Sequence, residues 1–197
     1  KHASIGVYDL DALGAAGGDG VLDLEYTPAE PEFSFTPLGF EHPQNCREIL
    51  ATHPKGRAYA HLLAGFDRYP LLRRASGAVL SMPPIINSDE TKVHLGTTRL
   101  FIDVTGTGRR ITQRTLNILV TSLLEMDTEA RLFAVELTNA TTEEGTLGGE
   151  SLRTPDLLPQ RARIDTARTA RLLGIPLDDA LLRRLLERMR HGVSGEG

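Results

Sequence analysis

The sequence predicts a protein of the α+β class, and three observations support this expectation. Over residues 99–105, the apolar Leu100, Ile102 and Val104 alternate with Phe101, Asp103 and Thr105, which is typical of a strand with two unlike faces. Apolar residues recur at helical spacing over residues 112–126 and predict an amphipathic helix. Beyond Leu152, a proline-containing joint precedes two further helical patterns. We therefore expect two domains, residues 1–150 and residues 151–197.

The same criteria predict the remaining elements in chain order. A glycine-rich turn is expected over residues 14–20, and the proline-containing residues 27–42 are expected to form an ordered loop. Pro54 is expected to separate two helices, because a proline cannot continue the helix before it. The expected strands are residues 4–10, 20–26 and 131–137, the expected helices are residues 44–53, 56–66, 165–173 and 177–190, and residues 138–149 are expected to form a polar loop.

The stretch over residues 78–91 combines apolar residues with prolines and polar side chains. Pro83 and Pro84 restrict the backbone and remove two amide donors, so they cannot lie in the middle of a helix or a central strand. A stiff extended segment would anchor its apolar ends in a core and present Ser81 and Asn87 to a ligand. A proline-stiffened connection at a sheet edge is the alternative, and composition alone favours it.

One face of the strand over residues 99–105 carries Phe101, Asp103 and Thr105, because side chains alternate along a strand. A carboxylate beside a hydroxyl can orient a water molecule or bind a substrate hydroxyl. A polar strand face in contact with solvent is the ordinary alternative. Phe101 argues against that alternative, because it would place a large aromatic ring in water.

Composition and charge limit the classes of protein. The 197 residues suffice for one large or two small domains with a hydrophobic core, and no apolar run approaches the length of a membrane span. The single cysteine, Cys46, excludes an internal disulfide and suits a reducing compartment. From Ser151 onward the sequence contains nine arginines and six acidic residues, a net charge of +3. Because the whole chain carries −4, residues 1–150 carry −7. Such a domain is a poor nucleic-acid binder on its own.

Known catalytic and cofactor-binding motifs do not occur in this sequence. It has neither a phosphate-binding loop nor a complete dinucleotide fingerprint, and its six histidines lack metal-ligand spacing. We therefore expect no metal, and any chemistry would rely on substrate positioning and water activation. The chain begins with lysine and ends in a glycine-rich segment, so we expect it to be a piece of a longer protein.

Several segments in order resemble one family. They are K-H-A-S-I-G-V-Y-D-L at residues 1–10, V-L-S-M-P-P-I-I-N-S at 79–88, L-F-I-D-V-T-G-T at 100–107 and T-P-D-L-L-P at 154–159. They resemble the β subunit of phenylalanyl-tRNA synthetase of the archaeal and eukaryotic type, in its editing module. Residues 151–197 then look like a linker and the first helices of a small helical domain that is truncated here.

The resemblance implies an α+β editing domain with mixed or antiparallel sheets and packed helices. It implies hydrolysis of tyrosine mis-attached to the phenylalanine tRNA, in a cytoplasmic heterotetramer of two α and two β subunits. Its partners would be the α subunit, tRNA(Phe), and tyrosine or tyrosyl-adenosine in the editing pocket, with no membrane partner. This segment would need no cofactor, whereas the full enzyme would use ATP and Mg²⁺ for charging.

Carried over by motif position, the resemblance implies five site residues. Asp103 would face the phenol or the attacking water, and Ser81 and Thr105 would hydrogen-bond substrate or water. Leu72 would form an apolar wall, and Asn87 would lie nearby to bind substrate. A non-catalytic module that contacts the α subunit or tRNA is the competing hypothesis, and a free-standing relative acting on mischarged tRNA is a third.

Overall fold

The computed structural model describes residues 3–14, 22–138, 141–142, 145–146 and 151–195. The chain divides into two compact units, Lys1–Asp156 and Leu157–Gly197. This division falls later than the one drawn from sequence after residue 150. The reason is that strand β12 (Leu152–Thr154) pairs with β9 (Val135–Leu137) and therefore remains with the first unit.

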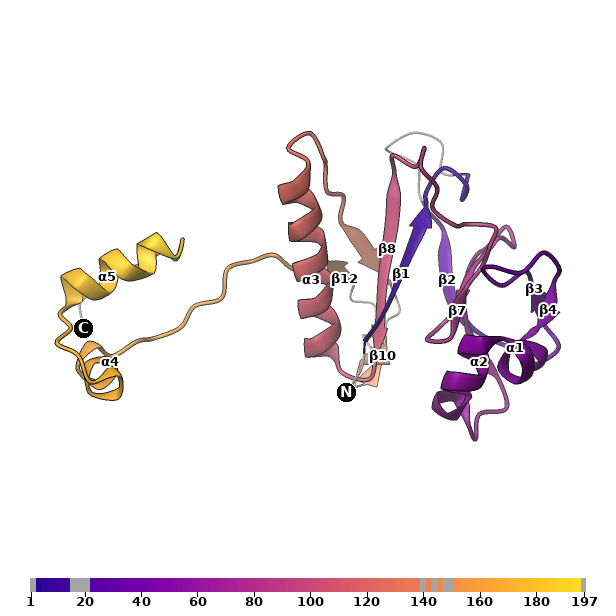
Figure 1. Ribbon diagram of the computed structural model, residues 1–197, viewed down its shortest axis with the longest axis horizontal. Coiled ribbons are helices and arrows are strands. Elements are labelled where there is room, and N and C mark those ends of the chain that lie inside the picture. Colours follow the sequence, from indigo (N-terminus) through magenta and orange to yellow (C-terminus); the bar gives the residue numbers. More distant parts are fainter. Residues whose placement is uncertain (1–2, 15–21, 139–140, 143–144, 147–150, 196–197) are drawn as a thin grey trace. The chain divides into compact units, whose positions relative to one another are not determined.

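The first unit has antiparallel sheets with packed helices, which confirms the α+β fold class. β1 (Ala3–Asp9) pairs antiparallel with β8 (Leu100–Gly106), and α3 (Arg109–Met126) packs against both strands. Figure 1 shows α3, the β1–β8 pair, the larger sheet and the helices α1 and α2 in succession. The β1–β8 pair is therefore enclosed between a helix and a second sheet.

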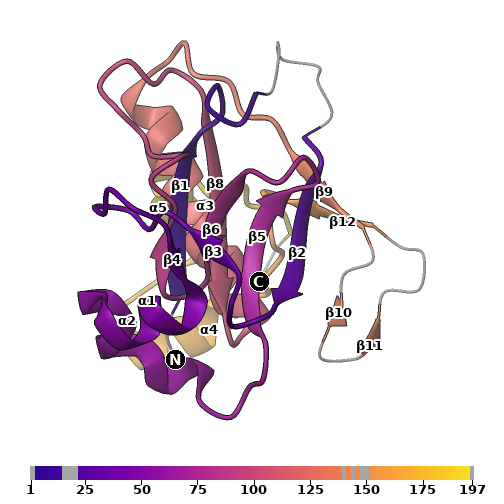
Figure 2. The same ribbon diagram turned by 90° about the vertical axis from the view of Figure 1, so that its right-hand side faces the viewer.

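The larger sheet has four antiparallel strands in the order β2-β5-β6-β7. Their bounds are β2 (Leu24–Ala29), β5 (Tyr69–Arg74), β6 (Val79–Met82) and β7 (Ile86–Asn87). Figure 2 shows β2, β5 and β6 side by side. All four residues of β6 are buried, because packed layers cover both faces of this strand.

The proline pair forms a tight hairpin between β6 and β7, so the extended segment expected over residues 78–91 is wrong in its middle. Pro83 and Pro84 occupy the turn, where their missing amide donors are not needed, and the Ile85 N–H donates to the Met82 carbonyl. The hairpin pairs Ser81 directly with Asn87. The exclusion of the prolines from a central strand is confirmed.

The loop expected over residues 27–42 contains strand structure. β2 continues to Ala29, and β3 (Ser34–Phe35) pairs with β4 (Gln44–Asn45). Most of the glycine-rich turn expected over residues 14–20 lies outside the described residues. The strand expected over residues 131–137 is limited to β9, and the loop expected after it contains the short pair β10 (Thr141–Thr142) and β11 (Gly145–Thr146).

Two helices meet at His53, as Pro54 predicts. Asn45 caps α1 (Cys46–Thr52) through a capping box with Glu48. His53 ends α1, and its Nδ1 accepts the Lys55 N–H at the start of α2 (Pro54–Tyr59), 3.2 Å away. A short 3₁₀ turn, η1 (Ala60–Leu63), follows α2. Pro54 begins a helix here because the first helical position needs no amide donor.

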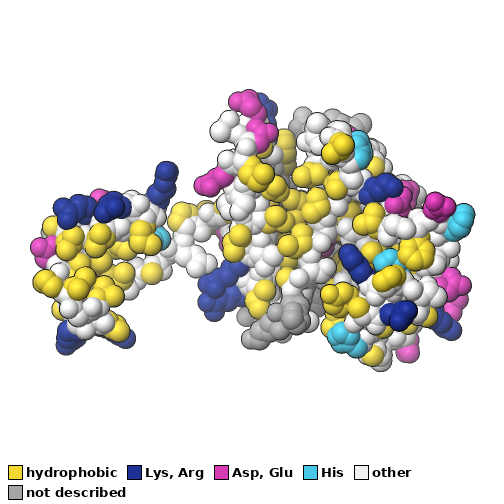
Figure 3. Space-filling model, in the orientation of Figure 1, with side chains coloured by type: hydrophobic (Ala, Val, Ile, Leu, Met, Phe, Trp, Pro, Cys, Tyr) yellow, Lys and Arg dark blue, Asp and Glu magenta, His cyan; other side chains and the backbone are white. Residues whose placement is uncertain are grey.

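The second unit contains α4 (Thr166–Leu173) and α5 (Asp179–Arg188). Asp165 and Asp178 cap their N-termini, and Gly174 ends α4 in the left-handed conformation. Figure 3 shows basic side chains along the edges of this unit and hydrophobic side chains between them. No helix in the described part of the chain has the length and apolar character required to cross a membrane.

Two hydrophobic clusters lie on opposite sides of the four-stranded sheet. The first packs α1 and the β3 region against the sheet through Phe35, Ile49, Leu71 and Met82, among others. The second packs β1 against the sheet and contains Tyr8, Leu13, Leu72 and Leu80, with Phe101 at its margin. The second cluster therefore brings β1 and β8 to the face of the sheet that carries Leu72.

A buried carboxylate, Asp9, holds the C-terminal end of β1. Its Oδ1 accepts the N–H groups of Asp11 and Ala12 at 2.8 and 3.1 Å, and its Oδ2 accepts the Thr97 hydroxyl. His94 Nε2 lies 3.2 Å from the same Oδ2. Hydrogen bonds from Thr97 and then Ala12 lower the pKa of Asp9 below its ordinary value.

This lowered pKa predicts a pH-dependent stability. Because the folded chain favours the ionised form, Asp9 contributes stability that is complete above the ordinary pKa of 3.8 and is lost as the pH falls through the lower, folded-state value. We expect the free energy of unfolding to fall more steeply in acid for the wild-type chain than for Asp9→Asn. Urea unfolding at a series of pH values below 5 checks this; parallel curves for the two proteins would contradict it.

Candidate functional site

Strand β8 carries Asp103 and Thr105 on the face that points toward the second hydrophobic cluster. Phe101 lies on the same face and stacks on Tyr8 of β1, with ring centroids 6.0 Å apart. The alternation along the strand is thus as the sequence predicts. The large ring packs against another aromatic side chain, so this face is not simply a solvated one.

A chain of hydrogen bonds joins three of the predicted site residues through Tyr8. The Tyr8 hydroxyl oxygen lies 2.6 Å from Asp103 Oδ1 and 2.9 Å from Ser81 Oγ. The Thr105 hydroxyl donates to Asp103 Oδ2 over 3.0 Å. Ser81 of β6, Tyr8 of β1, and Asp103 and Thr105 of β8 therefore form one network that links the two sheets.

The direction of each hydrogen bond follows from the number of protons. A phenol has one proton, and an ionised carboxylate can only accept. Tyr8 therefore donates to Asp103, and the Ser81 hydroxyl donates to the Tyr8 oxygen. Both oxygens of Asp103 receive a donor, while the Ser81 oxygen keeps its lone pairs for another partner.

Burial and charge set the protonation states in this network. Burial raises the pKa of Asp103 above its ordinary value, and the hydrogen bonds from Tyr8 and Thr105 act in the opposite direction. Burial and the charge of Asp103 raise the pKa of Tyr8 above its ordinary value. Tyr8 consequently remains a proton donor throughout the physiological range of pH.

The two remaining predicted residues, Leu72 and Asn87, lie in one row of the four-stranded sheet together with Ser81 and Tyr26. Tyr26 of β2, Leu72 of β5, Ser81 of β6 and Asn87 of β7 are paired in register. Leu72 is 7% exposed and packs in the same cluster as Tyr8. Tyr26 is 59% exposed, and burial of part of its ring together with the charge of Asp103 raises its pKa.

Gly6 has no side chain that could collide with the hydrogen-bonded network. It pairs across the strands with Asp103. A Cβ at this position would lie 2.1 Å from Asp103 Oδ1 and 2.1 Å from the Tyr8 hydroxyl oxygen, both far inside van der Waals contact. The absence of a side chain at residue 6 therefore allows the Tyr8 hydroxyl to reach Asp103.

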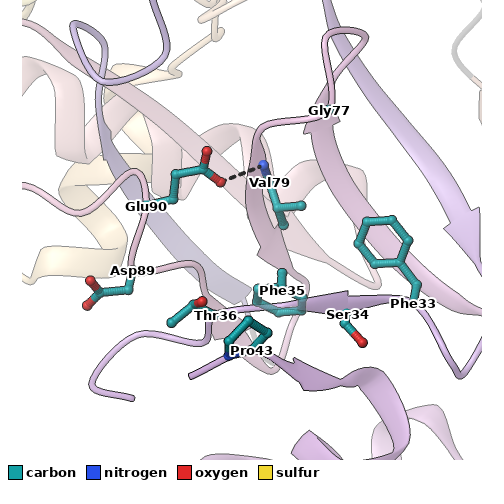
Figure 4. A pocket seen from close by; sticks show the side chains of 9 residues that line it. All are labelled: Phe33, Ser34, Phe35, Thr36, Pro43, Gly77, Val79, Asp89 and Glu90. Carbon is teal, nitrogen blue, oxygen red and sulfur yellow. Dashed lines mark hydrogen bonds between the residues drawn. The ribbon is translucent and has the colours of Figure 1, made fainter. Parts of the chain in front are cut away.

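Two hollows on the surface lie away from these residues. One has a volume of about 410 Å³, and Figure 4 shows Phe33, Phe35, Val79 and Glu90 among its lining side chains. The other, of about 700 Å³, lies beside residues 107–114. Neither is lined by a predicted site residue. Within the described ranges, no three His, Cys, Asp or Glu side chains are grouped so that they could hold a metal ion.

The structure brings all five predicted site residues into one region, and sequence reasoning missed three others. Ser81, Asp103 and Thr105 share the network, while Leu72 and Asn87 flank Ser81 in the sheet. The missed residues are Gly6, Tyr8 and Tyr26. A tyrosine in a strand is ordinarily a core residue, and only the pairing of β1 with β8 shows that Tyr8 reaches Asp103.

Comparison with known proteins gives consistent results. No family model matches the chain. The phenylalanine–tRNA ligase β subunit of Methanosarcina acetivorans is 37% identical over 194 residues, which make up 98% of this chain and 32% of that protein. The β subunit of Thermococcus onnurineus is 36% identical over 197 residues, 100% of this chain and 32% of that protein. The chain thus spans about a third of the length of these curated relatives.

A solved structure has the same fold. The crystal structure of an N-terminal fragment of the phenylalanyl-tRNA synthetase β-subunit from Pyrococcus horikoshii matches with a TM-score of 0.81 at 34% identity, over 96% of this chain and 50% of that chain. Over this segment, the chain therefore shares the sequence and fold of aminoacyl-tRNA synthetase subunits. More narrowly, it belongs to the family of phenylalanyl-tRNA synthetase β subunits over the segment compared.

Proposed function

We propose that this module hydrolyses tyrosine from mischarged tRNA(Phe), as the editing domain of a phenylalanyl-tRNA synthetase β subunit. The observation that carries the proposal is the hydrogen-bonded network of Ser81, Tyr8, Asp103 and Thr105. Asp103 accepts a phenolic hydroxyl from within the protein, so its carboxylate has the chemistry that recognises tyrosine. A carboxylate has about four lone-pair sites, and two internal donors leave room for a substrate phenol or a water molecule.

The physical need for such a site is clear. A hydrophobic pocket that accepts phenylalanine cannot strongly reject a side chain that merely adds a hydroxyl. A second site with a buried acceptor does discriminate, because an unpaired buried acceptor costs about 1–3 kcal/mol. The ester of an aminoacyl-tRNA is already activated, so a positioned water and a few fixed dipoles can suffice for its hydrolysis.

Each residue has a role in this proposal. Asp103 accepts a hydrogen bond from the phenol or from the attacking water, and Thr105 holds its other oxygen. Ser81 offers lone pairs to the substrate or to water. Leu72 provides an apolar wall beside Ser81, and Asn87 supports the substrate from the next strand.

The proposal extends to the whole enzyme. The module would act in the cytoplasm within a heterotetramer of two α and two β subunits, with tRNA(Phe) and tyrosine or tyrosyl-adenosine as its ligands. ATP and Mg²⁺ would serve the charging reaction elsewhere in the enzyme. The module needs no cofactor for an ester hydrolysis that relies on positioned water.

A non-catalytic tRNA-contact module is the second candidate, and one observation favours it. Arg109, Arg110 and Arg114 are exposed near the N-terminus of α3, where cations oppose the helix dipole. Among the residues that the structure describes, their guanidinium groups have no carboxylate partner. Three unneutralised charges in an acidic unit suit contacts with phosphates.

Deacylation by the complete wild-type synthetase separates these two candidates. We expect release of tyrosine from preformed Tyr-tRNA(Phe) to be much faster than release of phenylalanine from Phe-tRNA(Phe), because only the phenol can pair with the buried acceptor. Labelled amino acid freed over time is the measurement, with buffer alone as the control. A complex that binds tRNA(Phe) but releases tyrosine no faster than buffer would support the contact module and overturn the editing proposal.

A further inference from the structure

Tyr8 joins the two sheets at the point where the proposed chemistry lies. Its side chain is 1% exposed, and its hydroxyl meets Ser81 of one sheet and Asp103 of the other. Within the described residues, the hydrogen bonds of the Tyr8 hydroxyl thus connect β6 with β8. The phenol is therefore a direct link between the two functional groups.

Packing alone does not require the hydroxyl. The ring stacks on Phe101 and packs with Leu72 and Leu80, and a phenylalanine would make the same apolar contacts. A buried carboxylate is costly unless it is well paired, so an apolar pair at residues 8 and 103 would serve stability at least as well. A polar network that departs from the most stable choice is expected where function requires it.

We infer that Tyr8 is a positioning residue of the deacylation site, whose phenol holds Asp103 in one orientation and fixes Ser81 as a hydrogen-bond acceptor. This inference rests on the proposed editing function. Because the single proton of Tyr8 goes to Asp103, the proton of Ser81 is committed to the Tyr8 oxygen. Ser81 then presents only lone pairs. These can accept a hydrogen bond from the α-ammonium group or phenol of the substrate, or from the attacking water.

The same contact also influences the charge state of Asp103. Donation from Tyr8 to Oδ1 favours the ionised carboxylate and offsets part of the effect of burial, which favours the protonated acid. A carboxylate that must accept a hydrogen bond is inactive when protonated. Removing the hydroxyl should therefore raise the pKa of Asp103 and move the loss of activity in acid to higher pH.

Tyr8→Phe in the complete synthetase tests the inference. We expect deacylation of Tyr-tRNA(Phe) to fall between about 10- and 100-fold, the range that is typical when a group orienting a metal ligand is lost in other proteins. We also expect the acid limb of its pH–rate profile to move to higher pH, which a purely structural role would not cause. Charging with phenylalanine should remain at the wild-type level, which shows that the complex is folded.

Tyr69→Phe is the matched control, because Tyr69 lies at the start of β5 and packs in the other hydrophobic cluster. Wild type and Asp103→Ala are measured alongside. If wild type releases no tyrosine, the proposed function fails. If Asp103→Ala loses the activity while Tyr8→Phe keeps the wild-type rate and pH profile, the inference alone is overturned. A slower Tyr8→Phe enzyme with an unmoved acid limb also overturns it.

Discussion

Release of tyrosine from Tyr-tRNA(Phe) is expected to fall by about 100-fold or more when Asp103 is replaced by alanine in the complete synthetase. The change removes the acceptor for a phenol or an attacking water. It also leaves the Tyr8 and Thr105 hydroxyls without their shared partner. Charging of tRNA(Phe) with phenylalanine should be unchanged, since that reaction would use another part of the enzyme. Deacylation and charging rates of the same preparation are the measurement.

Asp89→Ala is the control for this prediction. Asp89 is an acid that follows β7 and pairs with Lys92 outside the network, so its loss should leave deacylation at the wild-type rate. Asp103→Asn separates the two roles of Asp103, because an amide can still hydrogen-bond a phenol but is a poor proton acceptor for water. Equal tyrosine release by wild type and Asp103→Ala would show that Asp103 is structural.

Gly6→Ala is expected to destabilise the chain by about 1–3 kcal/mol and to reduce deacylation at the same time. The new Cβ would lie 2.1 Å from both Asp103 Oδ1 and the Tyr8 hydroxyl oxygen, so at least one of them must move. Either movement breaks the contact between these two groups. Urea unfolding of the chain measures the first effect, and tyrosine release by the complete synthetase measures the second.

A double-mutant cycle with Tyr8→Phe identifies the cause. Three atoms lie too close to a Cβ at residue 6: Asp103 Oδ1, the Tyr8 hydroxyl oxygen and, at 2.5 Å, the Tyr8 ring carbon Cζ. Tyr8→Phe removes the hydroxyl but keeps Cζ, so Gly6→Ala should cost less, but still a measurable amount, in that background. Equal costs in both backgrounds would mean that the Tyr8 hydroxyl does not cause the destabilisation, which would then come from the remaining contacts with Cζ and Asp103 or from a movement of β1.

Local patterns in the sequence were sufficient for the elements and for the face of β8. Strict alternation over β8 places Asp103 and Thr105 together on one side, because successive side chains on a strand point in opposite directions. The apolar stripe predicts α3, and Pro54 predicts the break between α1 and α2. These features depend on residues close in sequence, and short-range sterics and periodicity determine them.

The structure around the proline pair could not be predicted from the local sequence alone. Pro83 and Pro84 exclude a helix and a central strand, but the same residues suit an extended segment and a tight turn. The hairpin forms because β6 and β7 pair with each other as neighbouring strands of the larger sheet. The short strands of residues 27–42 were missed for the same reason, since each is stabilised by its partner and not by its own sequence.

The sequence by itself determined the class of fold, the long helix, the position of the break at Pro54 and, through family resemblance, the five candidate site residues. Tertiary structure alone decided that Tyr8 lies between Ser81 and Asp103, and that Gly6 leaves room for it. The physical reason is the distance along the chain. Residues near 8, 81 and 103 meet only when β1 pairs with β8 and packs on the sheet, and no local pattern encodes that encounter.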